Sequence, residues 1–189
     1  PTGAGLGGGS SNAAGLIKGL NTIYKLNLTE TQMKSIALSL GSDVSFFIKG
    51  GTQQGEGTGE KLSTLPCPVS GAVLLVIPNV HIDTSWAYSM IKKKLDYVDK
   101  SPNFASLLQE NIFPVEIFKN DFEKIVFPAY PKIGEIKKAL IDLGAVYASL
   151  SGSGSTVYGI FKNEPVASSA KLHFNLSYNT VVTFPSNAA

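Results

Sequence analysis

The sequence predicts a protein of mixed helix and sheet, either an α/β or an α+β sandwich. After residue 68, apolar runs of strand length alternate with amphipathic stretches of helix length. Hydrophobic residues make up 43% of the 189 residues and charged residues 16%, which supplies a core and is too little charge for disorder. The length suits one large or two small domains, and Pro66 and Pro68 mark the expected boundary.

The first 68 residues are expected to be mainly helical, with a short sheet segment at their end. Thr29 and Gln32 fit a capping box at the start of a helix, and Gly41 fits its end. The expected elements are helices at residues 12–24 and 29–40, a helix or a strand at 44–51, and turn and strand at 52–65.

Residues 69–189 are expected to form a second region of alternating strands and helices. The stretch 72–77 is apolar throughout, which is typical of a strand buried on both faces. Thr84 is expected to cap the next helix, and Gly144 to end a later one. The expected helices are residues 84–95, 104–111, 120–127, 131–143 and 165–174, and the further strands are 145–150, 156–161 and 180–184.

Composition excludes several functional classes. The net charge is +2 and all 16 basic residues are Lys, so neither a nucleic-acid-binding field nor an Arg clamp on phosphate is expected. The single cysteine, Cys67, excludes an internal disulfide framework and a Cys-based zinc site. No apolar run is long enough to span a bilayer and no secretion signal is visible, so we expect no membrane partner.

A glycine-rich loop at residues 3–11 gives the strongest functional signal. It holds five glycines in residues 3–9, then two serines, and enters a helix directly. Glycines allow close backbone approach, their N–H groups form anion nests, and a helix N-terminus adds its dipole and unpaired N–H groups. The loop therefore predicts a polyphosphate ligand rather than a flexible linker. It is not a Walker A loop, because no Lys follows the last glycine.

Two other segments fit both a chemical and a structural role. Asp43 lies between small and apolar residues, just beyond the end of a helix. This position fits either a partly desolvated general base or a helix-capping residue. The glycine-serine turn at residues 151–155 fits a hairpin turn or a second phosphate-contacting loop. A further glycine-rich turn at residues 55–60 is expected to be structural.

The chain begins at Pro1 and enters the glycine-rich loop with no strand before it, although such loops normally follow a strand. We therefore expect an N-terminal portion to be missing. A sheet without its first strands would expose edges and apolar faces. The 189 residues alone are accordingly expected to be inactive.

Five motifs, in order and spread over nearly the whole chain, resemble those of the GHMP kinases. They are residues 1–14, 41–60, 78–88, 120–123 and 150–155. The resemblance implies an α+β, two-lobe fold. Residues 1–68 would be the remainder of an ATP-binding lobe like ribosomal protein S5 domain 2, and residues 69–189 a ferredoxin-like lobe. The family's first motif, with its catalytic Lys, has no counterpart here.

The first three motifs are most similar to those of members that phosphorylate 4-diphosphocytidyl-2-C-methyl-D-erythritol. The resemblance therefore implies transfer from ATP to the 2-hydroxyl of that small molecule, in the non-mevalonate isoprenoid pathway of bacterial cytoplasm or plastid stroma. Two alternatives remain: a homoserine- or mevalonate-type kinase of the family, and a nucleotide-binding module without turnover. The 78–88 segment discriminates between the kinases, because it belongs to cytidine recognition.

The same resemblance implies roles for individual residues. Asp43 would take or orient the proton of the attacking hydroxyl. Ser11 would lie near Mg²⁺, and Thr84 and Tyr88 at the cytidine. The residues that would contact ATP are Gly3, Gly5, Leu6, Gly7, Gly8, Gly9, Ser10, Ser11, Asn12, Gly152, Ser153 and Gly154.

Overall fold

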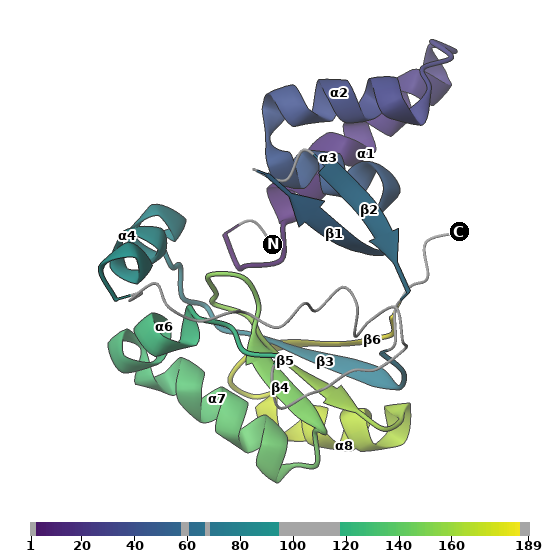
Figure 1. Cartoon of the computed structure of the whole chain (residues 1–189). Helices are drawn as coiled ribbons and strands as arrows, with labels where there is room; N and C mark the ends of the chain where they lie inside the picture. Colours follow the sequence, from purple (N-terminus) through teal and green to yellow (C-terminus); the bar gives the residue numbers. More distant parts are fainter. Residues whose placement is uncertain (1–2, 58–60, 67–68, 95–117, 186–189) are drawn as a thin grey trace. The chain divides into compact units, whose positions relative to one another are not determined.

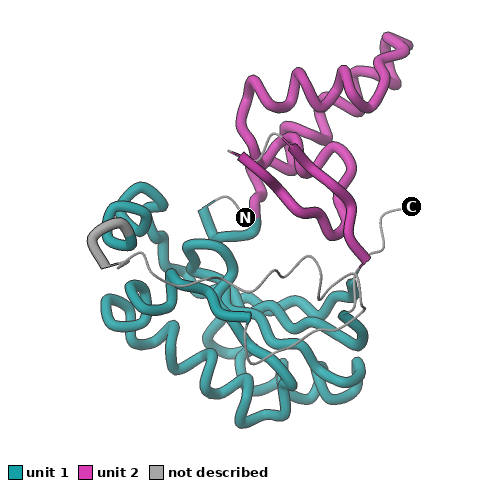
Figure 2. Tube along the Cα trace, in the orientation of Figure 1, with its two compact units in different colours: residues 1–6, 69–102, 113–185 teal, residues 7–68, 103–112, 186–189 magenta. Residues whose placement is uncertain are grey.

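The computed structural model describes residues 3–57, 61–66, 69–94 and 118–185. These fall into two units (Figure 2). The helical unit contains the described residues from 7 to 66, and the sheet unit contains residues 3–6, 69–94 and 118–185. The helix expected at residues 104–111 lies outside the described residues.

The helical unit consists of three helices and one antiparallel hairpin (Figure 1). Residues 44–51, for which helix and strand fitted equally well, are mostly helical. The first helix begins at Gly8, four residues before its predicted start, because the low helix propensity of glycine hides its first turn. The elements are α1 (Gly8–Ile23), α2 (Glu30–Leu40), α3 (Ser42–Lys49), β1 (Thr52–Glu56) and β2 (Lys61–Leu65).

The capping box predicted at the start of α2 is confirmed. The Gln32 backbone N–H donates to Thr29 Oγ1 at 3.3 Å, and the Thr29 N–H donates to Gln32 Oε1 at 2.9 Å. Gly41 ends α2 and is also the N-cap of α3. This shared residue joins the two helices without a loop, which fixes the start of α3 and the position of Asp43 in its first turn.

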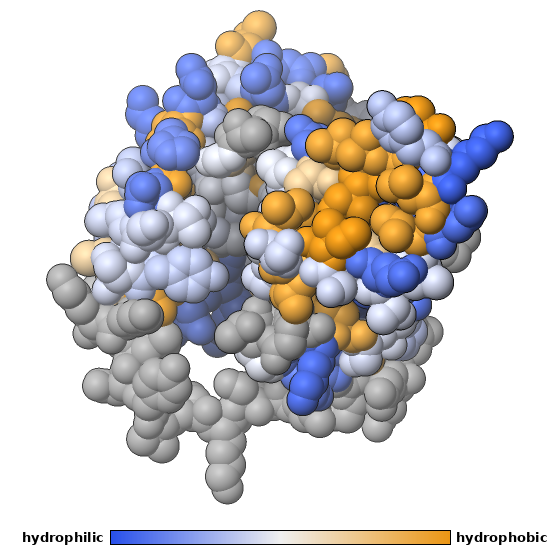
Figure 3. Space-filling model, turned by 90° about the horizontal axis from the view of Figure 1, so that it is seen from above, coloured by the Kyte–Doolittle hydropathy of each residue, from blue (hydrophilic) through white to orange (hydrophobic). Residues whose placement is uncertain are grey.

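The core of the helical unit is small. Its buried apolar side chains are Ala14, Ile17, Ala37, Val44 and Ile48. Other apolar side chains of α1 and α2 are exposed: Leu16, Leu20, Ile23, Ile36 and Leu40. An apolar patch is visible on the molecular surface (Figure 3). The helices therefore bury only part of their apolar surface within the described residues.

The sheet unit contains a four-stranded antiparallel sheet in the order β4-β5-β3-β6. The chain order β3, helices, β4, β5, helix, β6 together with this strand order is the ferredoxin-like arrangement, which confirms the prediction for this region. The strands are β3 (Ala72–Ile77), β4 (Tyr147–Leu150), β5 (Val157–Phe161) and β6 (Asn179–Thr183), and the helices are α4 (Thr84–Lys94), α6 (Glu123–Ala129), α7 (Pro131–Asp142) and α8 (Glu164–Phe174).

Helices α7 and α8 lie against one face of this sheet (Figure 1). Residues of β3 alternate between fully buried positions, such as Leu74 and Val76, and half-buried positions, such as Leu75. The prediction that β3 is buried on both faces is therefore wrong, because the strand pairs antiparallel and one face of the sheet is less covered.

Two helix starts in the sheet unit also differ from prediction. The helix expected from residue 120 begins at Glu123, because the Asn120 side chain accepts the Phe122 N–H in a turn before it. Helix α4 is capped by Asp83, whose Oδ1 accepts the Trp86 N–H at 2.6 Å, and not by Thr84. The Thr84 hydroxyl is thereby available for another contact.

Candidate active site

The glycine-rich loop contains three left-handed residues at alternating positions. Gly3, Gly5 and Gly7 have φ values of 73°, 76° and 63°. Residues in this conformation occur in turns whose N–H groups converge on anions. A side chain at Gly7 would also collide with Phe47, because a Cβ there would lie 2.8 Å from the ring. The loop therefore has the backbone that the sequence predicts for phosphate binding.

The N-terminus of α1 offers free hydrogen-bond donors. Gly7 is the N-cap and has no side chain to satisfy them, and the first turn has no acidic residue. The Ser11 N–H bonds to Gly7 O at 2.8 Å, which starts the helical pattern. The N–H groups at residues 8–10 thus have no partner within the helix and add to its dipole. The Ser11 hydroxyl donates to Gly8 O at 3.0 Å.

The second glycine-rich segment lies against the first. The Ser151 hydroxyl donates to Gly5 O at 2.8 Å, and the Thr156 N–H donates to Ala4 O at 3.1 Å. A bond from the Ser151 N–H to Thr156 O at 2.8 Å closes the hairpin between β4 and β5. The segment is therefore a hairpin turn, and phosphate contact by residues 152–154 stays a prediction.

Helix α4 brings the predicted substrate residues to the same hairpin. The hydroxyls of Thr84 and Ser153 are 3.2 Å apart and hydrogen-bonded. Tyr88, one turn further along α4, is exposed, with its ring edge-on to Phe122 at 5.0 Å between ring centroids. The structure thus joins the predicted cytidine contact Thr84 to the predicted ATP contact Ser153.

Asp43 lies in the first turn of α3 and is exposed. The expectation of partial desolvation is therefore wrong. Gly41 is the N-cap and no side chain caps the helix, so Asp43 has no capping role either. Lys18 Nζ donates to Phe47 O at 3.0 Å, which ties α3 to α1. The catalytic role of Asp43 stays a prediction.

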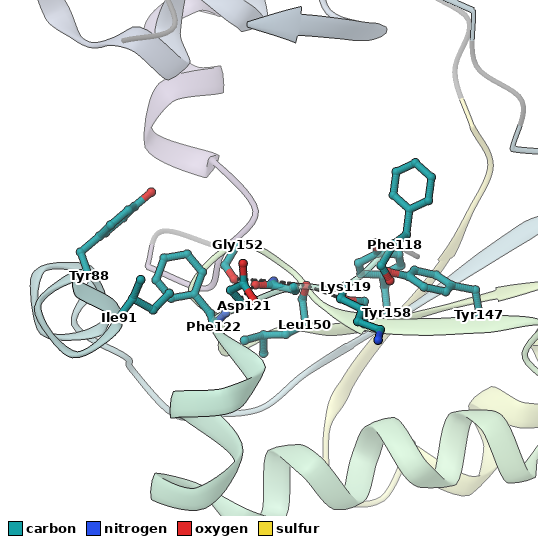
Figure 4. A pocket seen from close by; sticks show the side chains of 12 residues that line it. Tyr88, Ile91, Phe118, Lys119, Asp121, Phe122, Tyr147, Leu150, Gly152 and Tyr158 are labelled. Atoms are coloured by element: carbon teal, nitrogen blue, oxygen red, sulfur yellow. Dashed lines mark hydrogen bonds between the residues drawn. The ribbon is translucent and has the colours of Figure 1, made fainter. Parts of the chain in front are cut away.

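A cavity of about 500 Å³ opens in the sheet unit beside the hairpin (Figure 4). Aromatic rings stand at both ends, with Tyr88 and Phe122 at one end and Phe118, Tyr147 and Tyr158 at the other. Burial, and then the neighbouring Tyr147, raises the pKa of the Tyr158 phenol above its usual 10. The sequence did not single out the two strand tyrosines, since strand alternation does not show which face meets a cavity.

Asn120, Asp121 and Phe122 also line this cavity, although no role could be assigned to the motif at residues 120–123 from sequence alone. The described part of the chain holds no cluster of three or more His, Cys, Asp or Glu side chains suited to a metal ion. None of its helices combines the length and apolar character needed to cross a membrane.

Comparison with known proteins matches both ends of the chain to one family. Residues 1–51 match the model of the GHMP kinase N-terminal domain, and residues 102–179 match that of the GHMP kinase C-terminal domain. The chain is 39% identical over 189 residues to the 4-diphosphocytidyl-2-C-methyl-D-erythritol kinase of Chlorobium chlorochromatii, covering 97% of this chain and 65% of that protein. The kinase of the same name from Bacteroides thetaiotaomicron is 45% identical over 169 residues, covering 87% of this chain and 59% of that protein.

Solved structures agree with this assignment. The crystal structure of a 4-(cytidine 5'-diphospho)-2C-methyl-D-erythritol kinase matches with a TM-score of 0.82 and 27% identity, over 99% of this chain and 68% of that one. Homoserine kinase from Cytophaga hutchinsonii shares the fold, with a TM-score of 0.71 and 18% identity over 99% of this chain and 67% of that one. The chain spans 65%, 60% and 59% of three curated relatives. The chain belongs to the GHMP kinase family, as its motifs and its sheet topology both indicate.

Proposed function

We propose that the protein transfers the γ-phosphoryl group of ATP to the 2-hydroxyl of 4-diphosphocytidyl-2-C-methyl-D-erythritol. The names of its relatives support this substrate. The observation that carries the proposal is the convergence of predicted contacts on one hairpin. Its Ser151 bonds to Gly5 of the phosphate loop, and its Ser153 bonds to Thr84 of the acceptor segment. Residues 151–153 of the hairpin thus link the predicted ATP contacts to the predicted acceptor contacts.

Backbone groups bind most of the ATP phosphate charge in this proposal. The chain has no Arg, so N–H groups of the glycine-rich loop and of the first turn of α1 take the place of a guanidinium clamp. Residues 152–154 approach the phosphates from the hairpin. Fixed dipoles of this kind stabilise the charge of phosphoryl transfer without rearranging during the reaction.

Asp43 receives or orients the proton of the acceptor hydroxyl. The hydroxyl oxygen forms a bond to the γ-phosphorus, the bond from that phosphorus to the β–γ bridging oxygen breaks, and ADP leaves. Its carboxylate is exposed in the first turn of a helix, where an acceptor hydroxyl can reach it. Position, rather than an unusual environment, is what Asp43 contributes.

Ser11 suits a magnesium ion held mainly by phosphate oxygens. Mg²⁺ prefers oxygen ligands and usually takes few of them from the protein. Ser11 offers one hydroxyl oxygen in the first turn of α1, and no carboxylate lies in that turn. The ion would neutralise charge on the β- and γ-phosphates.

Thr84 and Tyr88 hold the cytidine end of the acceptor. The Tyr88 ring is exposed and makes a T-shaped contact with Phe122, which leaves part of its surface available to a stacked base. Stacking on an aromatic face is a usual means of holding a nucleobase. Thr84 places a hydroxyl at the junction with the hairpin.

ADP release by the protein expressed from its complete open reading frame tests the proposal. We expect turnover with 4-diphosphocytidyl-2-C-methyl-D-erythritol and not with homoserine or mevalonate. Asp43→Asn should lower kcat by about a hundredfold or more, since the carboxylate that takes the proton is lost. Asp142→Asn is the matched control, because Asp142 is an exposed partner of Lys138 on α7 and should leave kcat unchanged.

Three other outcomes would change the assignment. Turnover with homoserine or mevalonate alone would identify a different kinase of the family. Binding of ATP without turnover of any acceptor would indicate a nucleotide-binding module. An Asp43→Asn variant as fast as Asp142→Asn would remove Asp43 from the mechanism.

A further inference from the structure

We infer that Asn120 is a positioning residue that holds the hairpin between β4 and β5 in its ATP-binding conformation, an inference that rests on the proposed function. Its Nδ2 group donates to Leu150 O and to Gly152 O, each at 2.8 Å. Its Oδ1 accepts the Phe122 N–H at 3.0 Å. Only one orientation of the amide satisfies all three partners, so the turn before α6 fixes the side chain.

These bonds orient the peptide groups of the hairpin. In a trans peptide the N–H points away from the C=O. Drawing Gly152 O toward Asn120 therefore turns the Ser153 N–H to the opposite side of the hairpin, where it can face an anion. Left-handed φ values at Gly152 and Gly154, of 54° and 93°, allow this path.

Glu123 supports the same hairpin from one turn further on. Its Oε1 accepts the Leu150 N–H and the Ser149 hydroxyl, both at 3.0 Å, and its Oε2 pairs with Lys137 Nζ at 2.6 Å. Leu150 is thus bound through its C=O by Asn120 and through its N–H by Glu123. Figure 4 shows hydrogen bonds converging near Leu150 and Gly152 at the cavity.

The variant Asn120→Asp isolates the donor role of the amide. The aspartate keeps the size of the side chain and can still accept the Phe122 N–H, but it places a charged acceptor against two carbonyl oxygens. Asn163→Asp is the matched control. Asn163 caps α8 by accepting the Val166 N–H at 3.1 Å, a role that aspartate fills equally well.

The measurements are made on the protein expressed from its complete open reading frame, with AMP-PNP as the non-hydrolysable nucleotide. Asn120→Asp should weaken AMP-PNP binding and raise the KM for ATP by about tenfold, with a smaller effect on kcat at saturating ATP. Asn163→Asp should match the parent. The AMP-PNP affinity of Asn120→Asp should recover relative to the parent as the pH falls, because the protonated acid again donates a hydrogen bond. A residue needed only for folding would not produce this recovery.

Hydrogen exchange separates this inference from the proposed function. Amides of residues 150–156 should exchange faster in Asn120→Asp than in Asn163→Asp, whether or not the parent is a kinase. A parent without ATP binding or turnover would refute the proposed function, and the exchange rates would still decide whether Asn120 holds the hairpin. Unchanged exchange, or faster exchange with unchanged AMP-PNP affinity in an active parent, would overturn the positioning role.

Discussion

The two units differ in how completely they bury their apolar side chains. Among the described residues, the sheet unit has 17 buried residues in one core, whereas the helical unit has five. In the sheet unit α7 and α8 cover one whole sheet face. In the helical unit three helices meet each other and leave apolar stripes of α1 and α2 exposed. Stability within the described chain is therefore concentrated in the sheet unit.

Helix α1 shows this difference within one element. Ala14 and Ile17 are buried, while Leu16, Leu20 and Ile23 follow at helical spacing on an exposed face. Helical periodicity predicts that such a segment folds as a helix. Periodicity does not show which apolar face of α1 packs against another element, since more than one of its faces is apolar.

The largest expected effect is on the core of the sheet unit. Phe161→Ala should lower the free energy of unfolding by about 3–5 kcal/mol, because the fully buried ring would leave a cavity under α7 and α8. Urea denaturation measures the change. Phe184→Ala is the matched control, since that ring is 53% exposed and should cost less than about 1 kcal/mol. Equal losses for the two variants would refute the picture of a closed core.

A smaller effect is expected on the exposed face of the helical unit. In the 189-residue chain, Leu16→Lys with Ile23→Lys should change the unfolding free energy by less than about 0.5 kcal/mol per site and should reduce dye binding and self-association. Ile17→Lys places the same charge in the core and should unfold the helical unit. If the double variant is as destabilised as Ile17→Lys, the face of α1 that carries Leu16 and Ile23 is buried in the folded protein and not exposed.

Much of the fold was predictable because local patterns specify it. The capping box at Thr29, the strand at 72–77 and the turn at Gly144 follow from residue types and spacing alone. The errors in helix starts fall where glycines or a local side-chain bond change the first turn. The first turn of α1 is built from glycines, and the start of α6 is delayed by the side chain of Asn120.

The segments of the candidate site could be singled out from the sequence, whereas the environment of their residues could not. The glycine-rich loop and the hairpin at residues 151–155 were identified by composition, and the structure joins them through Ser151 and Gly5. The exposure of Asp43 was not predictable, because its apolar neighbours in sequence point elsewhere on α3. The bonds of Asn120 to the hairpin join residues 30 and 32 positions apart, which no local pattern shows.

The smallest expected effect concerns two ion pairs, one in each unit. Lys34 lowers the pKa of Glu30 below its usual 4.5, by hydrogen bonding and then by charge. A lowered pKa in the folded state gives stability above the unfolded-state pKa that is lost as the pH falls through the folded-state value. Because Glu30 is 53% exposed, a double-mutant cycle of Glu30→Gln and Lys34→Met should give about 0.3–0.5 kcal/mol near pH 7.

That coupling should disappear on acidification and in about 1 M salt, because solvent screens the exposed Glu30–Lys34 pair. Glu123 is only 15% exposed and its carboxylate also accepts two hydrogen bonds, so its coupling to Lys137 should survive the same salt. A cycle of Glu123→Gln and Lys137→Met measures it. If both couplings fall equally with salt, the polar network of the sheet unit is not shielded, and the two units differ only in their apolar cores.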